Sequence, residues 1–319
     1  MKISFAVILT FICCSCSLIN KVAVRTTGAV ISSGSDELLT ESNWSYFEKS
    51  VPANLKMMEG LWFTDQENKE LLMSLIKGFG GYAFAVSESK ALKDILEDNT
   101  SSNKVTQTLL YYEKAIFYGL KYLNASGISS EQFWDRTFSL KLDKVFNEEL
   151  SSNDRVAILY FAQALGSSIN LQRENVSKLG YFNHVKSMLK WVCSKQPNIE
   201  RGSCKLFDAV IEASTSGILG GNMDVAKNKF KDIIKEQPYN ILAKVSYVQY
   251  YLIPMLEEED FSVVMESINA DLNSWYKLQL GNRDASTEIF ENNRDFNLFN
   301  SIAKYRFRTL TKMKKQIFD

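Results

Sequence analysis

The segment KGFGGYAFAV, residues 77–86, carries three closely spaced glycines, a composition that can form a phosphate-binding loop. Such a loop has to lie between a strand and the first turn of a helix, where backbone N–H groups converge on the anion. No strand pattern precedes these glycines, and no Lys-Ser or Lys-Thr pair follows them. The segment instead continues an apolar pattern with a period close to 3.6 residues, formed by Leu72, Leu75, Ile76, Phe79, Ala83 and Val86. Because each glycine costs roughly 1 kcal/mol relative to alanine inside a helix, we predict a seam where a neighbouring helix packs closely.

Other groups that could carry out catalysis are sparse in this chain. His184, the one histidine, lies at the expected start of a helix, where a capping or surface role is favoured over that of a ligand or a base. The sequence has no nucleophile elbow, no zinc-ligand spacing and no paired-carboxylate motif. We therefore expect no catalytic residues, no metal site and no cofactor, and hence no enzymatic activity.

Several polar and aromatic residues could instead line a ligand cavity or a face for a partner protein. Glu59 stands in the apolar run LKMMEGLWF, where an unpaired buried carboxylate would be costly. We expect it to cap or bridge a neighbouring helix, with a place in a ligand cavity as the alternative. Tyr82 and Phe84 are either core residues or cavity walls. Similar alternatives, core or partner face, apply to the tyrosines of the run YVQYYLIPML, which are Tyr247, Tyr250 and Tyr251.

The C-terminal segment KYRFRTLTKMKKQIFD is strongly basic, with no acid before its last residue. Its basic residues are Lys304, Arg306, Arg308, Lys312, Lys314 and Lys315. A solvated face of a helix is the favoured interpretation. Contact with anionic lipid or with an acidic partner is the alternative, and such binding would weaken with salt.

The N-terminus has the pattern of a secretory signal peptide. A positively charged start precedes an apolar stretch that is too short to span a bilayer, and Ser15 stands immediately before Cys16. A small residue before a cysteine is the feature that a bacterial lipoprotein signal peptidase requires. We therefore expect residues 1–15 to be removed and Cys16 to carry acyl chains such as palmitate, which would anchor the protein to a membrane. Cys13 and Cys14 are alternative acylation sites, and an ordinary cleaved signal without lipid is a further alternative.

The composition limits the partners and the compartment of the rest of the chain. The 319 residues are 45% hydrophobic and have a formal net charge of zero, which argues against nucleic acid as a partner. No other run approaches 18 apolar residues, so we expect residues 16–42 to tether a soluble body formed by residues 43–319. Cys193 and Cys204 flank a turn in that body. We favour two buried thiols, with a disulfide in an oxidising compartment as the alternative.

The body is predicted to be a single all-α domain. Strict alternation of apolar and polar residues is rare, and hairpin signals are lacking. Helix-capping signals stand before apolar-periodic stretches at DQEN (65–68), TSSN (100–103), SSND (151–154) and QPYN (237–240).

Some of the expected helices carry the residue spacing of the second helix of a tetratricopeptide unit. This spacing occurs at Ala226, Phe230, Ile233 and Pro238, and again at Val185, Leu189, Val192 and Pro197. Weaker copies are Ala53, Met57, Gly60 and Asp65, and Ala115, Gly119, Tyr122 and Gly127. Because such hairpins bury their faces only against neighbours, we predict divergent tetratricopeptide-like helical-hairpin repeats stacked as a compact solenoid.

The region VPANLKMMEGLWFTDQENKELLMSLIKGFGGYAFAV resembles the N-terminal part of the T-component family of TRAP (tripartite ATP-independent periplasmic) transporters. The matching residues are Pro52, Leu55, Lys56, Glu59, Gly60 and Leu61 in a first helix, Asp65 and Asn68 in a turn, and Gly81, Tyr82, Ala83 and Ala85 in a second helix. The run YFAQALGSSINL and the C-terminal Asn300, Ile302, Ala303 and Arg306 extend the likeness. Departures are Gln66 and Phe307, where the family has proline and alanine, and Glu113-Lys114-Ala115, where it has an Arg-Gly pair.

The resemblance implies a periplasmic, lipid-anchored helical-repeat protein that assembles as a homotrimer. It also implies that the partner is the extracytoplasmic solute-binding protein of a TRAP-type secondary transporter, and that the ligand is a hydrophobic organic acid. A second hypothesis follows from the repeat signature alone. It is a general envelope scaffold of helical repeats that binds proteins and has no small-molecule ligand.

Overall fold

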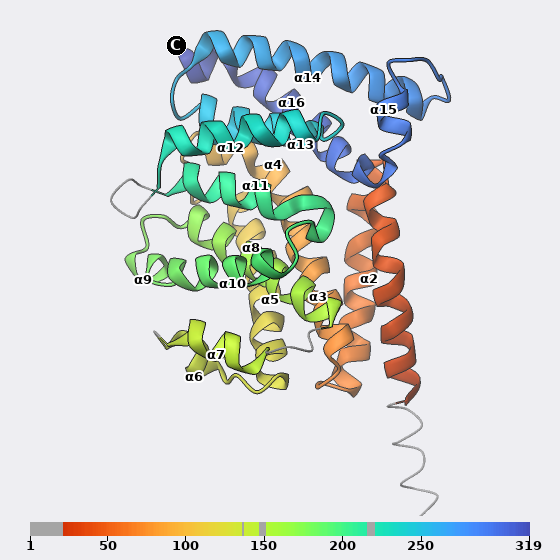
Figure 1. Cartoon of the computed structure of the whole chain (residues 1–319), viewed down its shortest axis with the longest axis vertical. Coiled ribbons are helices and arrows are strands. Elements are labelled where there is room, and N and C mark those ends of the chain that lie inside the picture. The colour runs from red at the N-terminus through yellow and green to blue at the C-terminus, as the bar shows by residue number, and fades with distance from the viewer. Residues whose placement is uncertain (1–21, 136, 147–150, 216–220) are drawn as a thin grey trace, which may run out of the picture.

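The chain is built from helices in the computed structural model, which describes residues 22–135, 137–146, 151–215 and 221–319 (Figure 1). Within these ranges there is no strand. The all-α prediction is therefore confirmed. The expected signal peptide, and with it Cys13, Cys14 and Cys16, lies outside the described residues.

The α-helices are α2 (Trp44–Thr64), α3 (Lys69–Tyr82), α4 (Ser89–Leu96), α5 (Asn103–Ala125), α6 (Ser130–Trp134), α7 (Phe138–Val145), α8 (Ser152–Leu171), α9 (Val176–Leu179), α10 (Phe182–Lys195), α11 (Ile199–Ser214), α12 (Met223–Glu236), α13 (Ile241–Tyr247), α14 (Glu258–Gln279), α15 (Glu288–Glu291) and α16 (Asn297–Phe318). Two π-helical turns interrupt this pattern, η2 (Ala83–Glu88) between α3 and α4 and η4 (Val248–Leu252) after α13. Two short 3₁₀ helices are η1 (Ser35–Thr40) and η5 (Arg294–Phe296).

The residues before α2 are helical and touch the body. Residues 22–34 form a helix that continues into η1. Val24 and Leu39 are buried, and the Arg25 Nε donates to the Asp65 carboxylate across 2.9 Å. The sequence analysis assigned residues 16–42 to a tether. The described part of this segment is largely helical, and its buried apolar residues pack against the body.

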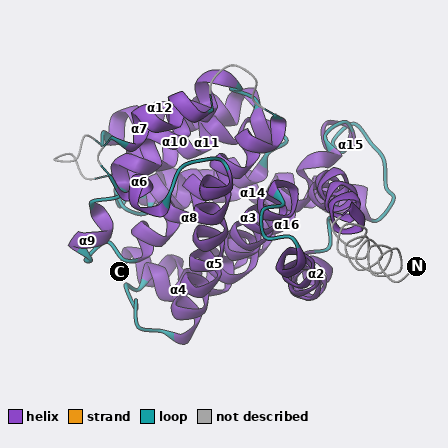
Figure 2. Cartoon of the chain, turned by 90° about the horizontal axis from the view of Figure 1, so that it is seen from below, coloured by secondary structure: helices purple, strands orange, loops and turns teal. Residues whose placement is uncertain are grey.

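Three mutually packed helices, α3, α5 and α8, form the centre of the core. Figure 2 shows them between α2 on one side and α6 and α7 on the other. In Figure 1, α14 and α16 lie at the end of the molecule opposite to α6 and α7. Side-chain caps fix where the central helices begin: Asn68 accepts from backbone N–H groups of α3, Ser102 from α5 and Ser151 from α8. These caps lie within three of the predicted capping signals.

The glycine seam on α3 is confirmed at one of its three positions. A Cβ atom at Gly78 would lie 2.5 Å from the Leu55 side chain of α2. At Gly80 it would lie 3.6 Å from the carbonyl oxygen of Tyr160 on α8, which is ordinary van der Waals contact. A Cβ at Gly81 would meet nothing within 4 Å. Gly78 therefore lets α2 approach, Gly80 lies at ordinary packing distance from α8, and Gly81 borders open space.

The stacked tetratricopeptide-like solenoid is not established by this arrangement. The marker residues on α10, α12 and α5 do face the core: Val185, Leu189, Val192, Ala226, Phe230, Ile233, Ala115 and Tyr122 are buried. The weak copy on α2 is wrong, because Ala53, Met57 and Gly60 are exposed. That helix buries a different face, formed by Phe47, Val51, Leu55 and Met58.

Candidate functional site

Two adjoining, largely apolar cavities lie beside α11. The first has a volume of about 390 Å³ and is lined by residues of α2, α3, α8, α11 and α16, together with residues of the 22–34 helix and of η1. The second has a volume of about 600 Å³ and lies among α8, α10 and α11. Phe84, Gln163, Leu206 and Phe207 line both cavities and therefore form the partition between them.

Helix α11 is fixed at its start by two features. Glu200, Arg201 and Gly202 have φ angles of 46°, 60° and 80°, a left-handed turn that non-glycine residues seldom adopt. Directly after this turn, a disulfide joins Cys204 to Cys193 of α10, with the Cα atoms 5.7 Å apart. The sequence analysis favoured two buried thiols, but in the structure the two cysteines form the disulfide that was given as the alternative. The bond ties the wall of both cavities to the neighbouring helix.

A charged cluster borders the first cavity, whose wall includes Lys77 and Tyr160. The Glu200 carboxylate accepts a hydrogen bond from the Lys77 ammonium at 3.1 Å and one from the Tyr160 hydroxyl at 2.8 Å. The Lys77 and Glu200 side chains are only 11% and 8% exposed. The left-handed turn thereby places a carboxylate between donors from α3 and α8, which is the kind of compensation that a buried charge requires.

Three other polar side chains that line the first cavity carry an atom without such compensation. The Oγ of Ser74 on α3, the Oε1 of Gln163 on α8 and the Oδ1 of Asn240 before α13 are buried and have no hydrogen-bond partner. Gln163 lies at the partition as well. Buried polar atoms in folded proteins nearly always have partners, so these three atoms are exceptions.

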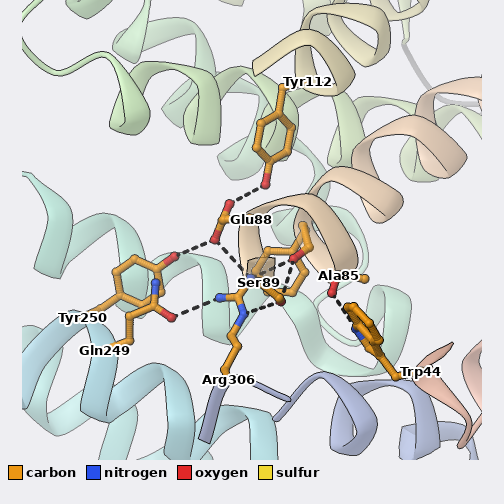
Figure 3. A network of polar contacts seen from close by, with 9 residues as sticks. Trp44, Ala85, Glu88, Ser89, Tyr112, Gln249, Tyr250 and Arg306 are labelled. Carbon is orange, nitrogen blue, oxygen red and sulfur yellow. Dashed lines mark hydrogen bonds and ion pairs between the residues drawn. The ribbon is translucent and has the colours of Figure 1, made fainter. Parts of the chain in front are cut away.

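A buried ion pair borders the second cavity (Figure 3). Arg306 of α16 is fully buried, and its Nη2 lies 3.1 Å from the Glu88 carboxylate. The guanidinium also donates to Ser89 Oγ at 2.9 Å and to Gln249 Oε1 at 3.1 Å. Glu88 in turn accepts from the Tyr112 hydroxyl at 2.5 Å. Burial, followed by the charge of Glu88, raises the pKa of Tyr112 well above its usual value.

The π-helical turn η2 supplies the backbone acceptors of this network. A π-turn breaks the regular i to i−4 hydrogen-bond pattern of the helix. The carbonyl oxygen of Phe84 accepts from Arg306 Nη2 at 2.8 Å, and that of Ala85 accepts from Trp44 Nε1 at 2.9 Å. The Arg306 guanidinium also lies 4.4 Å from the centre of the Phe84 ring. This corrects the expectation that Arg306 belongs to a solvated basic face.

Three of the proposed site residues lie at the cavities. Tyr82 lines the first cavity, Tyr250 lines the second, and Phe84 lines both. Burial raises the pKa of Tyr82 to about 12 and also raises that of Tyr250. These residues come from η2 and η4 and from the end of α3, and the Tyr250 hydroxyl lies 3.5 Å from the Glu88 carboxylate at the second cavity.

The other three proposed residues do not line either cavity. Glu59 bridges α2 and α5, where it accepts from Lys114 and, at 2.8 Å, from the Tyr118 hydroxyl. Burial opposes ionisation there, but these hydrogen bonds lower the pKa of Glu59 below its usual value. Tyr247 and Tyr251 are buried and stacked on each other, with ring centres 5.4 Å apart. A role of these residues at a partner face stays a prediction.

His184 lies in a cluster of aromatic rings, away from the cavities. It is 8% exposed and stacks on the ring of Phe138, with ring centres 5.4 Å apart. Burial lowers the pKa of His184 below 6.5. Among the residues that the structure describes, no group of three or more His, Cys, Asp or Glu residues is placed to hold a metal ion. Nor, in these ranges, is any helix both long and apolar enough to cross a membrane.

Sequence reasoning missed Ser74, Gln163 and Glu200, and it placed Arg306 on the wrong face. For Arg306 a signal was present. Ile302, Arg306, Leu310 and Met313 follow one another at intervals of four, four and three, so the arginine shares the buried face of α16. No comparable signal marks Ser74 and Gln163. Their helices, α3 and α8, are buried on nearly all sides, so the sequence pattern does not single out one buried face.

Comparison with known protein families bears on the whole domain that holds these cavities. The family model described as TRAP transporter T-component matches residues 41–318. No curated protein matches the chain. The match covers the second cavity, most of the wall of the first, α11 and the Arg306–Glu88 pair, and it confirms the resemblance found in the sequence. The chain therefore belongs to the TRAP transporter T-component family.

Proposed function

We propose that this protein is a membrane-anchored, periplasmic accessory subunit of a TRAP-type transporter. In this proposal it binds the extracytoplasmic solute-binding protein of the transporter and holds a hydrophobic organic acid in its cavities. Family membership supports the association with a transporter. The paired apolar cavities are the observation that favours a ligand-handling role over that of a scaffold without a ligand.

The cavities have the size and chemistry of small-molecule sites. Their volumes, about 390 and 600 Å³, lie in the range that such sites occupy. Leu55, Met58, Leu206 and Phe207 are among the apolar side chains that face the first cavity. Burying an apolar ligand chain against such walls contributes about 25 cal/mol per Å² of apolar surface removed from water.

Native mass spectrometry of the full-length protein tests the assembly and the ligand together. We expect a homotrimer in which each subunit carries extra mass of a few hundred daltons, removable by denaturation. A bare monomer would favour the alternative of a general scaffold. The lipid anchor is tested in the same spectra: the mass should include acyl chains, and Cys16→Ala should abolish them.

Binding to the partner is tested by biolayer interferometry against the solute-binding protein of a TRAP-type transporter. We expect saturable binding. The matched control is a solute-binding protein from an ATP-driven transporter, which should not bind. Equal binding to both proteins, or to neither, would contradict the proposed partnership.

A further inference from the structure

Exposed apolar side chains occur on several elements at the end of the molecule where the described chain begins. Phe63, near the end of α2, is 74% exposed, and Leu140 of α7 is 71% exposed. Val22, at the start of the 22–34 helix, and Val145, at the end of α7, are exposed as well. Single exposed apolar residues are common on soluble proteins, so the meaning of these four depends on what else lies at this end.

Side-chain contacts join the elements that carry these residues. Arg25 of the 22–34 helix donates from Nε to the carboxylate of Asp65, directly after α2, at 2.9 Å. The ammonium of Lys69, at the start of α3, lies 5.7 Å from the ring centre of Phe146, directly after α7. The start of the 22–34 helix, the end of α2 and the end of α7 therefore lie together. Figure 1 shows the start of this helix and α7 at the same end of the molecule, opposite α14 and α16.

Leu140 lies on the side of α7 that faces away from the rest of the protein. The buried residues Phe138 and Leu142 are each two positions from Leu140, which corresponds to about 200° around a helix. Phe138 stacks on His184 of α10, with ring centres 5.4 Å apart, so the buried face of α7 is turned toward α10. In Figure 1, α10 lies further from this end of the molecule than α7 does. Leu140 therefore lies on the outward face of α7, and Lys144, one turn later, shares that face.

The 22–34 helix is joined closely to the body at this end. Besides the ion pair between Arg25 and Asp65, the helix backbone packs against α3 at Gly28. A Cβ atom at Gly28 would lie 3.1 Å from the Leu71 side chain, which is closer than side chains normally pack. The place at which the chain enters the body is therefore fixed at the end of the molecule that carries the exposed apolar residues.

The length of the chain limits the distance between the expected acyl anchor and this end. Cys16 and Val22 are six residues apart, and six residues span at most about 20 Å in a fully extended chain. Helix α2 runs toward the other end, where Trp44 at its start stacks on Tyr305 of α16 with ring centres 4.2 Å apart. The 21 residues of α2 correspond to about 32 Å. If α14 and α16 faced the bilayer, residue 22 would lie beyond the reach of an anchor at Cys16.

We propose that this end of the molecule rests on the lipid bilayer and inserts Phe63 and Leu140 into the interface between head groups and acyl chains. The inference rests on the proposed membrane anchoring and adds an orientation of the body, which an anchor alone does not give. The outward face of α7 suits such an interface, because Leu140 can enter the apolar layer while the ammonium of Lys144 stays in water. The long axis of the protein then stands away from the membrane, with α14 and α16 furthest from it.

Nitroxide labels measure this contact with the bilayer. The full-length protein with Phe63→Cys or Leu140→Cys is labelled at the new thiol and reconstituted through its acyl anchor into phosphatidylcholine vesicles. With Cys16 acylated and Cys193 bonded to Cys204, the introduced cysteine is the one free thiol of the mature protein. Power-saturation paramagnetic resonance then compares collisions of the label with oxygen, which enters the bilayer, and with a nickel complex, which stays in water.

Val263→Cys is the matched control, since Val263 is 62% exposed and lies on α14 at the opposite end. We expect the nickel complex to lose most of its collisions at positions 63 and 140 on the vesicles and to keep them at position 263. All three side chains are exposed, so the substitutions should leave the melting temperature unchanged. A loss of collisions therefore reports contact with lipid rather than a change in the fold.

The outcomes separate the bilayer contact from the anchoring on which it rests. Equal access of the nickel complex to positions 63, 140 and 263, on vesicles that retain the protein, would overturn the bilayer contact and leave the proposed anchoring standing. Protection of position 263 instead of positions 63 and 140 would also overturn the contact, because the opposite end would then face the lipid. Failure of the protein to associate with the vesicles would overturn both the contact and the membrane-anchoring part of the proposed function.

Discussion

Arg306 and Phe84, 222 residues apart in the sequence, are joined twice. The guanidinium donates from Nη2 to the Phe84 carbonyl oxygen at 2.8 Å, and it also lies 4.4 Å from the centre of the Phe84 ring. One side chain of the last helix thereby holds both the backbone and the ring of one of the residues that line both cavities. The C-terminal helix thus helps to shape the two cavities.

Replacing Arg306 with methionine should destabilise the protein by about 3–5 kcal/mol, because Glu88 would be left as an uncompensated buried charge. Urea unfolding measures the change. The matched control is Arg308→Met on the same helix; Arg308 is exposed, so its loss should change stability by no more than about 0.5 kcal/mol. Adding Glu88→Gln to Arg306→Met should recover part of the loss. Equal stability of the two single variants would contradict the structural role of Arg306.

Stability should depend on pH through His184. Burial lowers its folded-state pKa below 6.5, so the unfolded chain takes up the proton first as the pH falls. The stability contributed by the neutral ring is therefore present above the unfolded-state pKa and is lost as the pH falls below it. The melting temperature measured from about pH 8 to about pH 5 should fall less in His184→Phe than in the wild type. Since the chain has one histidine, parallel curves would show that His184 is not the group responsible.

Two glycine-to-alanine substitutions should have opposite effects. A Cβ at Gly119 of α5 would lie 2.5 Å from the Phe161 ring, so Gly119→Ala should destabilise the protein by roughly 1–3 kcal/mol. A Cβ at Gly81 would meet nothing within 4 Å, so Gly81→Ala should stabilise α3 by up to about 1 kcal/mol. Chemical denaturation of both variants checks the difference. Equal shifts in the same direction would be incompatible with this packing.

Reduction of the disulfide should lower the stability of the protein. Cys193 and Cys204 are separated by 11 positions, and closing a loop of this length typically contributes about 2–4 kcal/mol. The melting temperature should fall when dithiothreitol is added to the wild type. The double variant Cys193→Ala, Cys204→Ala should melt at the lower temperature and not respond to dithiothreitol. An unchanged wild-type melting temperature on complete reduction would contradict the prediction.

The sequence predicted the helical framework well, because the signals are local. Capping residues such as Asn68, Ser102 and Ser151 stand where helices begin, and their side chains bond to the next turn. The close packing at Gly78 was likewise predictable, since glycines in a helix interior need compensation. Family membership followed from motifs that these same helices carry.

The cavities could not be predicted, because they depend on where distant helices leave space. Phe84 of η2 and Phe207 of α11 both line the two cavities, although they are far apart in the sequence. Glu200 contacts Lys77 because it lies in a left-handed turn of the backbone. The residue types before Gly202 do not predict that turn.

The π-turn between α3 and α4 has a consequence for insertions and deletions. A π-turn is equivalent to one residue added to a regular helix, and one residue corresponds to a rotation of about 100°. Removing a single residue from the segment Ala83–Glu88 would restore a regular helix and leave its length almost unchanged. It would also rotate everything beyond that point, so that Glu88 and Ser89 could no longer both face Arg306. The direction in which each residue points around the helix axis, rather than the hydrophobicity or length of this segment, therefore determines whether Glu88 and Ser89 can bond to Arg306 of the C-terminal helix.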